Sequence, residues 1–164
     1  MRTHTMVDSP VGALTLVATD GALSGVYLED QRYRPDQSTF GPRTDAGFEE
    51  AAEQLAEYFA GQRRHFTLRT RLAGSDFQRR VWQALTTIPY GQTWTYAELA
   101  DAVGRRDRIR AVGAANGRNP LAVVVPCHRV VGSDGSLTGY AGGLARKRFL
   151  LDLERPGPRP GRLF

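Results

Sequence analysis

Cysteine is almost absent from this sequence: the chain of 164 residues holds one, Cys127. A single cysteine cannot form an internal disulfide, so nothing in the composition indicates an oxidising compartment. The three histidines are scattered and lack the paired spacing of a zinc-ligand set, which argues against a structural zinc site. We therefore predict no metal.

Long apolar runs are missing as well. The opening residues, MRTHTMVDSP, lack the apolar core of a signal peptide, and no apolar stretch reaches membrane-spanning length. Hydrophobic residues make up 41% of the chain and charged residues 24%, which is ordinary for a soluble globular protein. We expect a cytoplasmic protein that does not bind membranes, built as one domain or two small lobes.

Lysine is scarce, and nearly all the basic residues are arginines. Residues 1–75 carry 8 arginines against 10 acidic residues, whereas residues 76–164 carry 14 basic against 7 acidic residues. Arginine binds phosphate bidentately and stacks on bases, so the basic second half favours a nucleic-acid partner. The alternative from charge alone is a solvated basic face that maintains solubility.

The first half has the pattern of a mixed α+β lobe. Residues 12–19 and 24–29 predict two strands joined by a hairpin turn at Asp20-Gly21. A helix is predicted over 48–61, and the alternation over 66–72 predicts a third strand with one wet face. The apolar stripe of the helix is Phe48, Ala52, Leu55 and Phe59.

The second half is predicted to be mainly helical. Asp76 is expected to cap the first helix. Thr95 and Glu98 match the capping box of a second helix, which ends at Gly104, and a third helix begins near Asp107. Two short helices joined around a glycine are typical of a helix-turn-helix, whose second helix would be presented to DNA.

The surface of that third helix combines small residues with arginines. Small side chains let a helix backbone approach a partner closely, although tight helix–helix packing selects them too. The nearby arginines favour DNA. The small residues are Ala111, Gly113, Ala114 and Ala115, and the arginines are Arg108, Arg110 and Arg118.

Cys127 lies in the stretch VVVPCHRVVG. A lone cysteine among valines is most often buried and inert, but its neighbours favour a nucleophile. His128 can accept the thiol proton directly or through one water, and Arg129 is placed to favour the thiolate. Adjacent side chains point apart on a strand, so this pair works only in a turn or through a bridging water.

A histidine that acts as a base needs a partner on its other ring nitrogen. Glu154, at the end of a helix predicted over 143–154, is a candidate, and an ordinary exposed glutamate is the simpler alternative. Tyr96 and Tyr140 are candidate proton donors, although tyrosine at the edge of a core is the commoner case. From the residues alone, we infer a candidate nucleophilic cysteine beside a helix-turn-helix, without a named substrate.

The stretch RAVGAANGRNPLAVVVPCHRVVGSDGSLTGYAGG, residues 110–143, closely resembles the signature of the methylated-DNA–protein-cysteine methyltransferases. Its elements RAVG, NP, PCHRV and GYxGG occur in the family's order and spacing. The resemblance implies an α+β fold, with a ribonuclease-H-like α/β lobe over 1–75 and a mainly helical lobe with a winged helix-turn-helix over 76–155. It covers the second lobe fully and the first loosely. We expect residues 156–164 to form a flexible tail.

The resemblance implies direct repair of double-stranded DNA that bears O6-alkylguanine. The alkyl group, most simply a methyl, would move irreversibly to Cys127, and O4-alkylthymine would react less efficiently. A thioether has no activated bond for water to cleave, so each molecule would act once. We expect no cofactor and a monomer in free solution, and cooperative binding along DNA stays open.

The family's catalytic positions carry over onto five residues of this chain. Cys127 matches the nucleophile, His128 the base that acts through a water, and Glu154 the acid that orients the histidine. Tyr96 matches the tyrosine that assists base flipping and protonates the departing guanine. Asn119 matches the hinge asparagine that supports the turn before the active-site segment.

The DNA-binding positions carry over in the same way. Arg110 matches the arginine that fills the base stack after the damaged base has been flipped out. Ala141 stands where some relatives have serine, and the zinc ligands of some relatives have no counterpart. The small residues Asn116 and Gly117 do not settle the size of the pocket entrance, so the tolerance of bulky alkyl adducts stays open. The implied DNA face is Arg110, Ala111, Gly113, Ala114 and Tyr96, and the implied base pocket is Tyr140, Ala141 and Val130.

Two other functions compete with this interpretation. One is a helix-turn-helix protein that senses or regulates by binding alkylated DNA without repairing it; known non-catalytic relatives replace the cysteine, which this chain keeps. The other is a hydrolase that uses Cys127, His128 and Glu154. A hydrolase would turn over, and it would leave the basic small-residue helix without a role.

Overall fold

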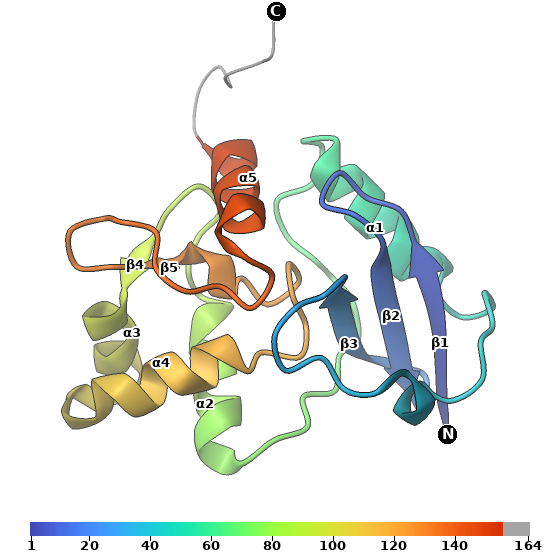
Figure 1. Ribbon diagram of the computed structural model, residues 1–164, viewed down its shortest axis with the longest axis horizontal. Helices are drawn as coiled ribbons and strands as arrows, with labels where there is room; N and C mark the ends of the chain where they lie inside the picture. The colour runs from blue at the N-terminus through green and yellow to red at the C-terminus, as the bar shows by residue number, and fades with distance from the viewer. Residues whose placement is uncertain (156–164) are drawn as a thin grey trace, which may run out of the picture. The chain divides into compact units, whose positions relative to one another are not determined.

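A computed structural model describes residues 1–155, which divide into two compact units (Figure 1). The first unit consists of Met1–Ala73 together with Pro120–Val124. The second consists of Gly74–Asn119 and, within the described residues, 125–155. Five residues from the middle of the second half are thus part of the first unit, which the sequence patterns did not indicate.

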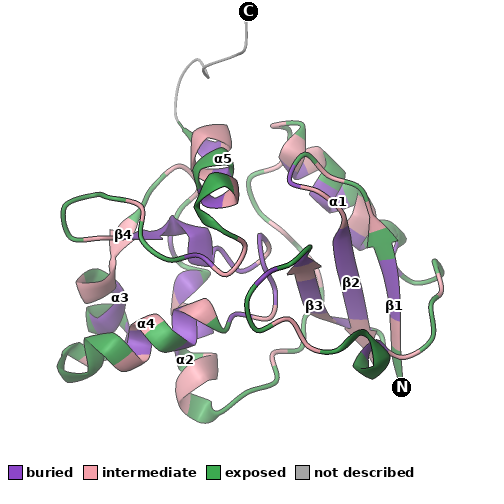
Figure 2. Cartoon of the chain, in the orientation of Figure 1, coloured by how far each residue is buried: buried purple, intermediate pink, exposed green. Residues whose placement is uncertain are grey.

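The first unit contains a three-stranded antiparallel sheet in the order β1 (Arg2–Val7), β2 (Leu14–Thr19) and β3 (Ala22–Leu28). The predicted hairpin turn is confirmed. Asp20 and Gly21 have φ values of 51° and 83°, as a two-residue turn with positive φ at both positions requires. Figure 2 shows that β2 is buried along most of its length.

Strand β1 was not predicted. Its buried side chains are those of His4 and Thr5, so the strand carries no apolar alternation. Thr5 instead donates a hydrogen bond from Oγ1 to the Asp45 carboxylate at 2.6 Å, and Nδ1 of His4 contacts the Gly41 carbonyl at 2.9 Å. Backbone pairing with β2 and these polar contacts, rather than an alternating apolar face, therefore hold this strand.

The predicted strand over 66–72 is wrong. Of that range only Thr70 bridges to the sheet, opposite Leu23 of β3. Farther along the same edge, Val26 of β3 pairs with Leu121 from the inserted segment. The segments around Thr70 and Leu121 therefore each pair with part of the β3 edge, where one long strand would otherwise lie.

Helix α1 (Glu49–Phe59) and the short 3-10 helix η1 (Gln37–Phe40) complete the first unit. The predicted helix over 48–61 is confirmed, and Gly61 follows it with φ 76°. The predicted apolar stripe is misplaced, because Ala52 and Phe59 are only half-buried. The buried face is Ala51, Gln54, Leu55 and Tyr58.

The second unit is mainly helical, as predicted. The described residues of this unit form four α-helices, and the core includes Trp82, whose indole Nε1 donates to the Ala115 carbonyl at 2.8 Å. No helix among residues 1–155 combines the length and apolar character that a bilayer crossing requires. The elements are α2 (Asp76–Leu85), β4 (Trp94–Thr95), α3 (Tyr96–Val103), η2 (Arg106–Arg108), α4 (Ile109–Gly117), η3 (Cys127–Arg129), β5 (Val130–Val131) and α5 (Leu144–Glu154).

The predicted helix-turn-helix is formed by α3 and α4. Thr95 and Glu98 form the capping box at the start of α3, and Gly104 ends the helix in the left-handed conformation. The 3-10 turn η2 then leads into α4, which begins two residues later than the predicted start near Asp107. Beside these helices, β4 and β5 pair in parallel over two residues each. The predicted tail, 156–164, lies outside the described residues.

The cap of α2 is Ser75, not the predicted Asp76. The Gln78 backbone N–H donates to Ser75 Oγ at 3.1 Å, and the Ser75 N–H donates to Gln78 Oε1 at 3.0 Å. Asp76 is already in the first helical turn. Serine followed three residues later by glutamine is itself a capping-box pattern, so the sequence carried the correct signal.

We predict that Ser75→Ala lowers the free energy of unfolding by about 1 kcal/mol, because it removes the acceptor for an N-terminal N–H of α2. Asp76→Ala is the matched control and should have a smaller effect. Urea denaturation of the two variants measures the difference. Equal losses would mean that the neighbouring carboxylate, rather than Ser75, stabilises the start of this helix.

Candidate active site

Cys127 lies at the start of the single helical turn η3. The residue before it, Pro126, has φ −82° and ψ 63°, and the Cys127 N–H donates to the Val125 carbonyl at 2.8 Å. These values define an inverse γ-turn. Cys127 and His128 therefore occupy a tight turn instead of opposite faces of a strand, which meets the condition for their cooperation.

The chain reaches this turn through a strained residue. Val123 has φ 71°, a conformation that β-branched side chains rarely adopt. Across it, the Val124 N–H donates to the Ala122 carbonyl at 2.8 Å, which closes a second γ-turn. Such a conformation costs roughly 1–3 kcal/mol and persists only where the surroundings enforce it. Here the Val123 side chain is 1% exposed.

The thiol of Cys127 is buried, and burial raises its pKa. Three groups oppose this shift: the Asn119 side chain, which hydrogen-bonds the sulfur, the charge of Lys147 and the backbone N–H of Cys127. Asn119 also donates from Nδ2 to the Val125 carbonyl at 2.8 Å, so it holds both the sulfur and the turn before it. Because the pKa is raised, the resting group is a thiol and needs a base to become a nucleophile.

His128, the next residue in the chain, is the candidate for that base. Its Nε2 lies 2.8 Å from Oε2 of Glu154, and both side chains are buried. Burial lowers the pKa of His128 despite the opposing effect of Glu154, so the imidazole is neutral near pH 7. Since a carboxylate only accepts, the ring proton resides on Nε2. Nδ1 has no hydrogen-bond partner and is left as a proton acceptor.

Arg129 does not favour the thiolate, as its position in the sequence suggested, but pairs with Glu154. Its Nε donates to Oε1 of Glu154 at 2.7 Å, and its Nη2 donates to Oε2 at 3.0 Å. A third donor, Nη1, reaches the Ile88 carbonyl at 2.7 Å. The guanidinium is thus used for neutralising the carboxylate that orients His128, a role that sequence reasoning missed.

Glu154 is consequently a strongly held carboxylate rather than an ordinary exposed residue. Burial alone would raise its pKa, but His128 and Arg129 together outweigh burial and lower the pKa to about 2. The group is ionised throughout the neutral range and can stabilise a proton that arrives on His128.

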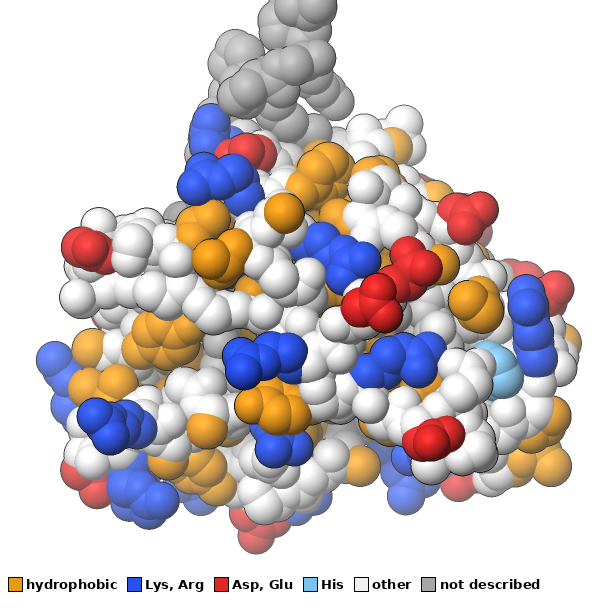
Figure 3. Space-filling model, in the orientation of Figure 1, with side chains coloured by type: hydrophobic (Ala, Val, Ile, Leu, Met, Phe, Trp, Pro, Cys, Tyr) orange, Lys and Arg blue, Asp and Glu red, His pale blue; other side chains and the backbone are white. Residues whose placement is uncertain are grey.

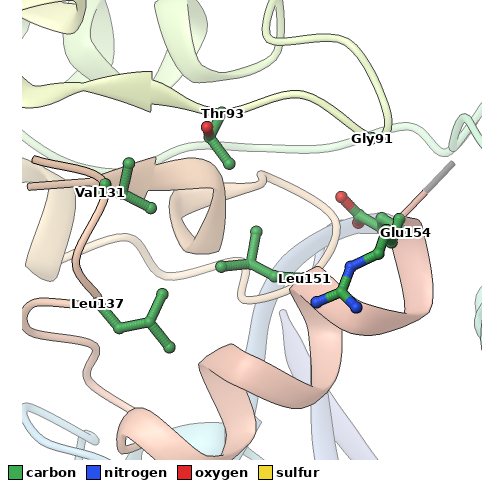
Figure 4. Close-up of a pocket in the computed structure, with 8 residues that line it drawn as sticks. Gly91, Thr93, Val131, Leu137, Leu151 and Glu154 are labelled. Atoms are coloured by element: carbon green, nitrogen blue, oxygen red, sulfur yellow. The ribbon is translucent and has the colours of Figure 1, made fainter. Parts of the chain in front are cut away.

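A cavity of about 230 Å³ adjoins this network (Figure 4). Leu137, Leu151 and Val131 supply apolar walls, and Thr93 and Glu154 supply polar groups. Glu154 thus borders a cavity whose lining does not include Cys127.

The small residues of α4 that were assigned to DNA lie toward solvent. Arg110 and Ala114 are exposed, and Ala111 and Gly113 are half-buried, whereas Ala115 faces the core. The phenol ring of Tyr96 packs beside Gly113: a Cβ added there would meet the ring at 3.5 Å. Of the four small residues Ala111, Gly113, Ala114 and Ala115, only Ala115 owes its small size to packing in the core of this unit.

A hollow of about 480 Å³ opens at the turn before α4. Figure 3 shows Lys and Arg side chains gathered over the α3 and α4 region. Arg106 and Arg105 are engaged with Asp101 and Asp107, respectively, and Arg108 lies over the Phe77 ring. The hollow is lined by Arg106, Asp107, Arg108, Ile109, Arg110 and Ala111.

The residues assigned to the base pocket line neither of these two cavities. The Tyr140 hydroxyl is buried without a partner, and burial raises its pKa well above the ordinary value, so the hydroxyl stays protonated. The negative charge that Cys127 carries as a thiolate raises the pKa of Tyr140 further. Ala141 is half-buried, and Val130 is fully buried in β5. Tyr96 accepts a hydrogen bond from Thr138 at 3.3 Å.

Two family profiles match the chain along nearly all of its length. Residues 76–156 match the DNA-binding domain of 6-O-methylguanine DNA methyltransferase, and residues 2–72 match its ribonuclease-like domain. The chain belongs to the methylated-DNA–protein-cysteine methyltransferase family. The predicted fold class, α+β with a ribonuclease-like first lobe and a helical DNA-binding second lobe, is confirmed by these matches.

Individual members of the methyltransferase family are closely similar to the chain. The methylated-DNA–protein-cysteine methyltransferase of Mycolicibacterium paratuberculosis is 54% identical over 151 residues, covering 91% of this chain and 90% of that protein. The constitutive enzyme of Bacillus subtilis is 42% identical over 160 residues, covering 94% and 96%.

Solved structures of the methyltransferase family agree. The O6-methylguanine methyltransferase of Mycobacterium tuberculosis has a TM-score of 0.88 and 46% identity, covering 99% of this chain and 97% of that one. The Mycobacterium tuberculosis OGT crystallised in complex with DNA has a TM-score of 0.87 and 49% identity, covering 93% and 92%.

Sequence reasoning missed two residues of this methyltransferase site: Arg129 in its pairing role, and Lys147. Lys147 is fully buried on α5, and its Nζ donates to three backbone carbonyls. The signal was present, since it is the one lysine in a chain with 21 arginines.

We predict that Glu154 makes folding sensitive to acid. Its carboxyl has a pKa of about 2 in the folded protein against an ordinary value of 4.5. The stabilisation is therefore complete above about pH 4.5 and is lost as the pH falls toward 2, with a total on the order of 3 kcal/mol.

Urea unfolding at pH 7, 4 and 3 measures this loss. Glu154→Gln should be less stable at pH 7, because Arg129 then lacks its counter-charge, and should lose less stability between pH 4.5 and 3. Asp152→Asn, on the same helix, should retain the wild-type acid response. A Glu154→Gln variant with wild-type acid sensitivity would contradict the assignment.

Proposed function

We propose that this chain repairs DNA by transferring the methyl group of O6-methylguanine to its own Cys127. The observation that carries the proposal is the buried series Cys127, His128 and Glu154, in which Nδ1 of His128 is left open to accept a proton. Membership of the methyltransferase family, with named enzymes at about half identity, supports this chemistry.

The reaction begins with loss of the Cys127 proton. It passes to Nδ1 of His128 through a water, and Glu154 stabilises the imidazolium that results. The thiolate then attacks the methyl carbon in line, an S–C bond forms, and the bond between the methyl carbon and O6 breaks. Tyr96 gives its phenol proton to the departing guanine. The resulting phenolate regains a proton through solvent as His128 releases the one that it took from Cys127. The products are unmodified guanine in DNA and S-methylcysteine.

The product cannot return to the starting state on its own. A thioether offers no activated bond to water, and the chain contains no second cysteine that could attack it. Each molecule is therefore used once. The same chemistry extends to other O6-alkylguanines and, less efficiently, to O4-alkylthymine, since each presents an alkyl carbon bonded to an oxygen of the base.

Double-stranded DNA is the partner, bound by lobe 76–155 through α4. Its exposed small residues allow a close approach to the groove, and Arg110 enters the stack as the damaged base leaves it. Tyr96 lies beside this face, next to Gly113. The DNA complex of the Mycobacterium tuberculosis protein, at 49% identity, supports this partner. Tyr140, Ala141 and Val130 form the pocket that receives the base, and Asn119 supports the turn in front of it.

Intact-protein mass spectrometry tests the transfer. After incubation with a duplex containing one O6-methylguanine, the protein should gain one methyl group, mapped to Cys127, and no more with excess DNA. Cys127→Ser should bind the same duplex without gaining mass, since its hydroxyl is a far weaker nucleophile near pH 7. An unchanged wild-type mass with DNA bound would instead favour a lesion-sensing protein, and repeated turnover with a free thiol would favour a hydrolase.

We predict that Arg110→Ala slows methyl transfer much more than it weakens DNA binding. The side chain replaces the stacking of a flipped base, so its loss should lower the single-turnover rate roughly 10-fold or more, since flipping costs a few kcal/mol. Fluorescence anisotropy should show a modest change in affinity. Arg148→Ala, an exposed arginine on α5, is the control. Equal losses of rate and affinity would assign Arg110 to phosphate binding only.

A further inference from the structure

Lys147 occupies an unusual environment for a lysine. Its side chain on α5 is fully buried, and within residues 1–155 its ammonium group donates to backbone carbonyls and to no carboxylate. Nζ donates to the carbonyl of Val130 at 2.5 Å, of Thr138 at 2.7 Å and of Gly139 at 3.2 Å. An ammonium group has three N–H donors, and each therefore has an acceptor.

These carbonyls come from two ends of one segment. Val130 directly follows the turn η3 that carries Cys127 and His128, and Thr138 and Gly139 directly precede Tyr140. By binding both ends, the ammonium group closes the intervening loop and fixes the backbone on either side of it. We name this arrangement the Lys147 clamp.

The clamp explains why this position holds a lysine and not an arginine. Basic positions elsewhere are occupied by 21 arginines, and this one holds the single lysine. Three carbonyls that converge on one atom require a compact, tetrahedral donor, whereas a planar guanidinium spreads its donors over a fork. Burial of an ion without a counter-ion is costly, so the site is built to compensate for it with carbonyl dipoles.

We propose that Lys147 is a positioning residue for methyl transfer: the clamp holds the Tyr140 segment and the Cys127 turn in register, and its charge favours the Cys127 thiolate. This inference rests on the proposed function, because it assigns Lys147 a role in the same reaction. It does not make Lys147 a catalytic residue, since the ammonium group is engaged with backbone carbonyls.

The electrostatics agree with the geometry. Lys147 lowers the pKa of Cys127 and also contributes to lowering that of His128, so its charge acts on both members of the nucleophilic pair. Burial lowers the pKa of Lys147 itself to about 8, despite an opposing effect of Cys127. The ammonium form therefore predominates below about pH 8 and declines above it. The charged or titratable groups on η3, the 132–140 loop and α5, which surround the clamp, are Cys127, His128, Arg129, Asp134, Tyr140, Arg146, Arg148, Asp152 and Glu154, and Tyr96 of α3 contacts Thr138.

Lys147→Met is the principal test, because methionine retains an unbranched apolar stem and removes the ammonium group. Lys147→Arg keeps the charge without the geometry, and Arg148→Met is the matched control on the exposed side of the same helix. Thermal unfolding establishes that each variant folds. The single-turnover rate with an O6-methylguanine duplex and the affinity for that duplex are then measured.

We expect Lys147→Met to bind DNA like the wild type and to transfer methyl about 10- to 100-fold more slowly, as small misplacements of reacting groups do. Lys147→Arg should not restore the rate, and Arg148→Met should leave it unchanged. A folded Lys147→Met variant that transfers within about twofold of the wild-type rate would overturn the clamp, since losses of that size lie far below the cost of a misplaced group.

The pH profile of thiol reactivity separates positioning from a merely structural role. Cys127 is the one cysteine, so its rate of alkylation by iodoacetamide reports on that thiol without background. Lys147→Met should move the midpoint to higher pH, and Lys147→Arg should move it less. A midpoint that stays at the wild-type value in both variants would overturn the electrostatic part of the proposal.

A measurement on the wild type covers the case in which Lys147→Met does not fold. Its transfer rate should stop rising, and then fall, above about pH 8, where the ammonium group loses its proton. Lys147→Arg should lack this decline. A wild-type rate that rises steadily to pH 10 would overturn the role of the charge. Absence of any wild-type methyl transfer would overturn the proposed function instead, and the iodoacetamide profile would still decide the effect of the lysine.

Discussion

The carboxylate of Glu154 is the interaction on which the rest of the site depends. It receives two hydrogen bonds from Arg129 and one from His128, all in a buried environment. Arg129 compensates for the burial of the carboxylate, and the carboxylate in turn determines the tautomer of His128. Only because Nε2 is occupied in this way does Nδ1 become the free acceptor. One shared carboxylate thus links the stability of the second unit to its capacity for proton transfer.

The backbone around Cys127 is held by tight turns and a side-chain hydrogen bond rather than by regular secondary structure. Two γ-turns, at Val123 and Pro126, follow each other within four residues, and Asn119 fixes the second of them through the Val125 carbonyl. A continuous strand would place Cys127 and His128 on opposite faces. The turn at Pro126, followed by η3, avoids that arrangement. Val123 is strained in the preceding turn, and burial of its side chain maintains that conformation.

Much of the fold followed from local patterns, and the exceptions have physical causes. The hairpin at Asp20-Gly21 and the capping box at Thr95 were predictable, because they depend on residues within one turn of each other. The sheet edge at β3 was not, since it is shared by segments about 50 residues apart. In the site, Cys127 and His128 were evident from sequence. The pairing of Arg129 was not, because it requires knowing where α5 ends.

The burial of Lys147 also determines how the protein reacts with reagents that modify amines. With that lysine enclosed and no other in the sequence, no lysine amine of the folded protein is accessible among the described residues. Reagents that acylate lysine should therefore leave the folded second unit unlabelled. Attachment at Lys147 should follow only when that unit opens, so acylation reports on its unfolding.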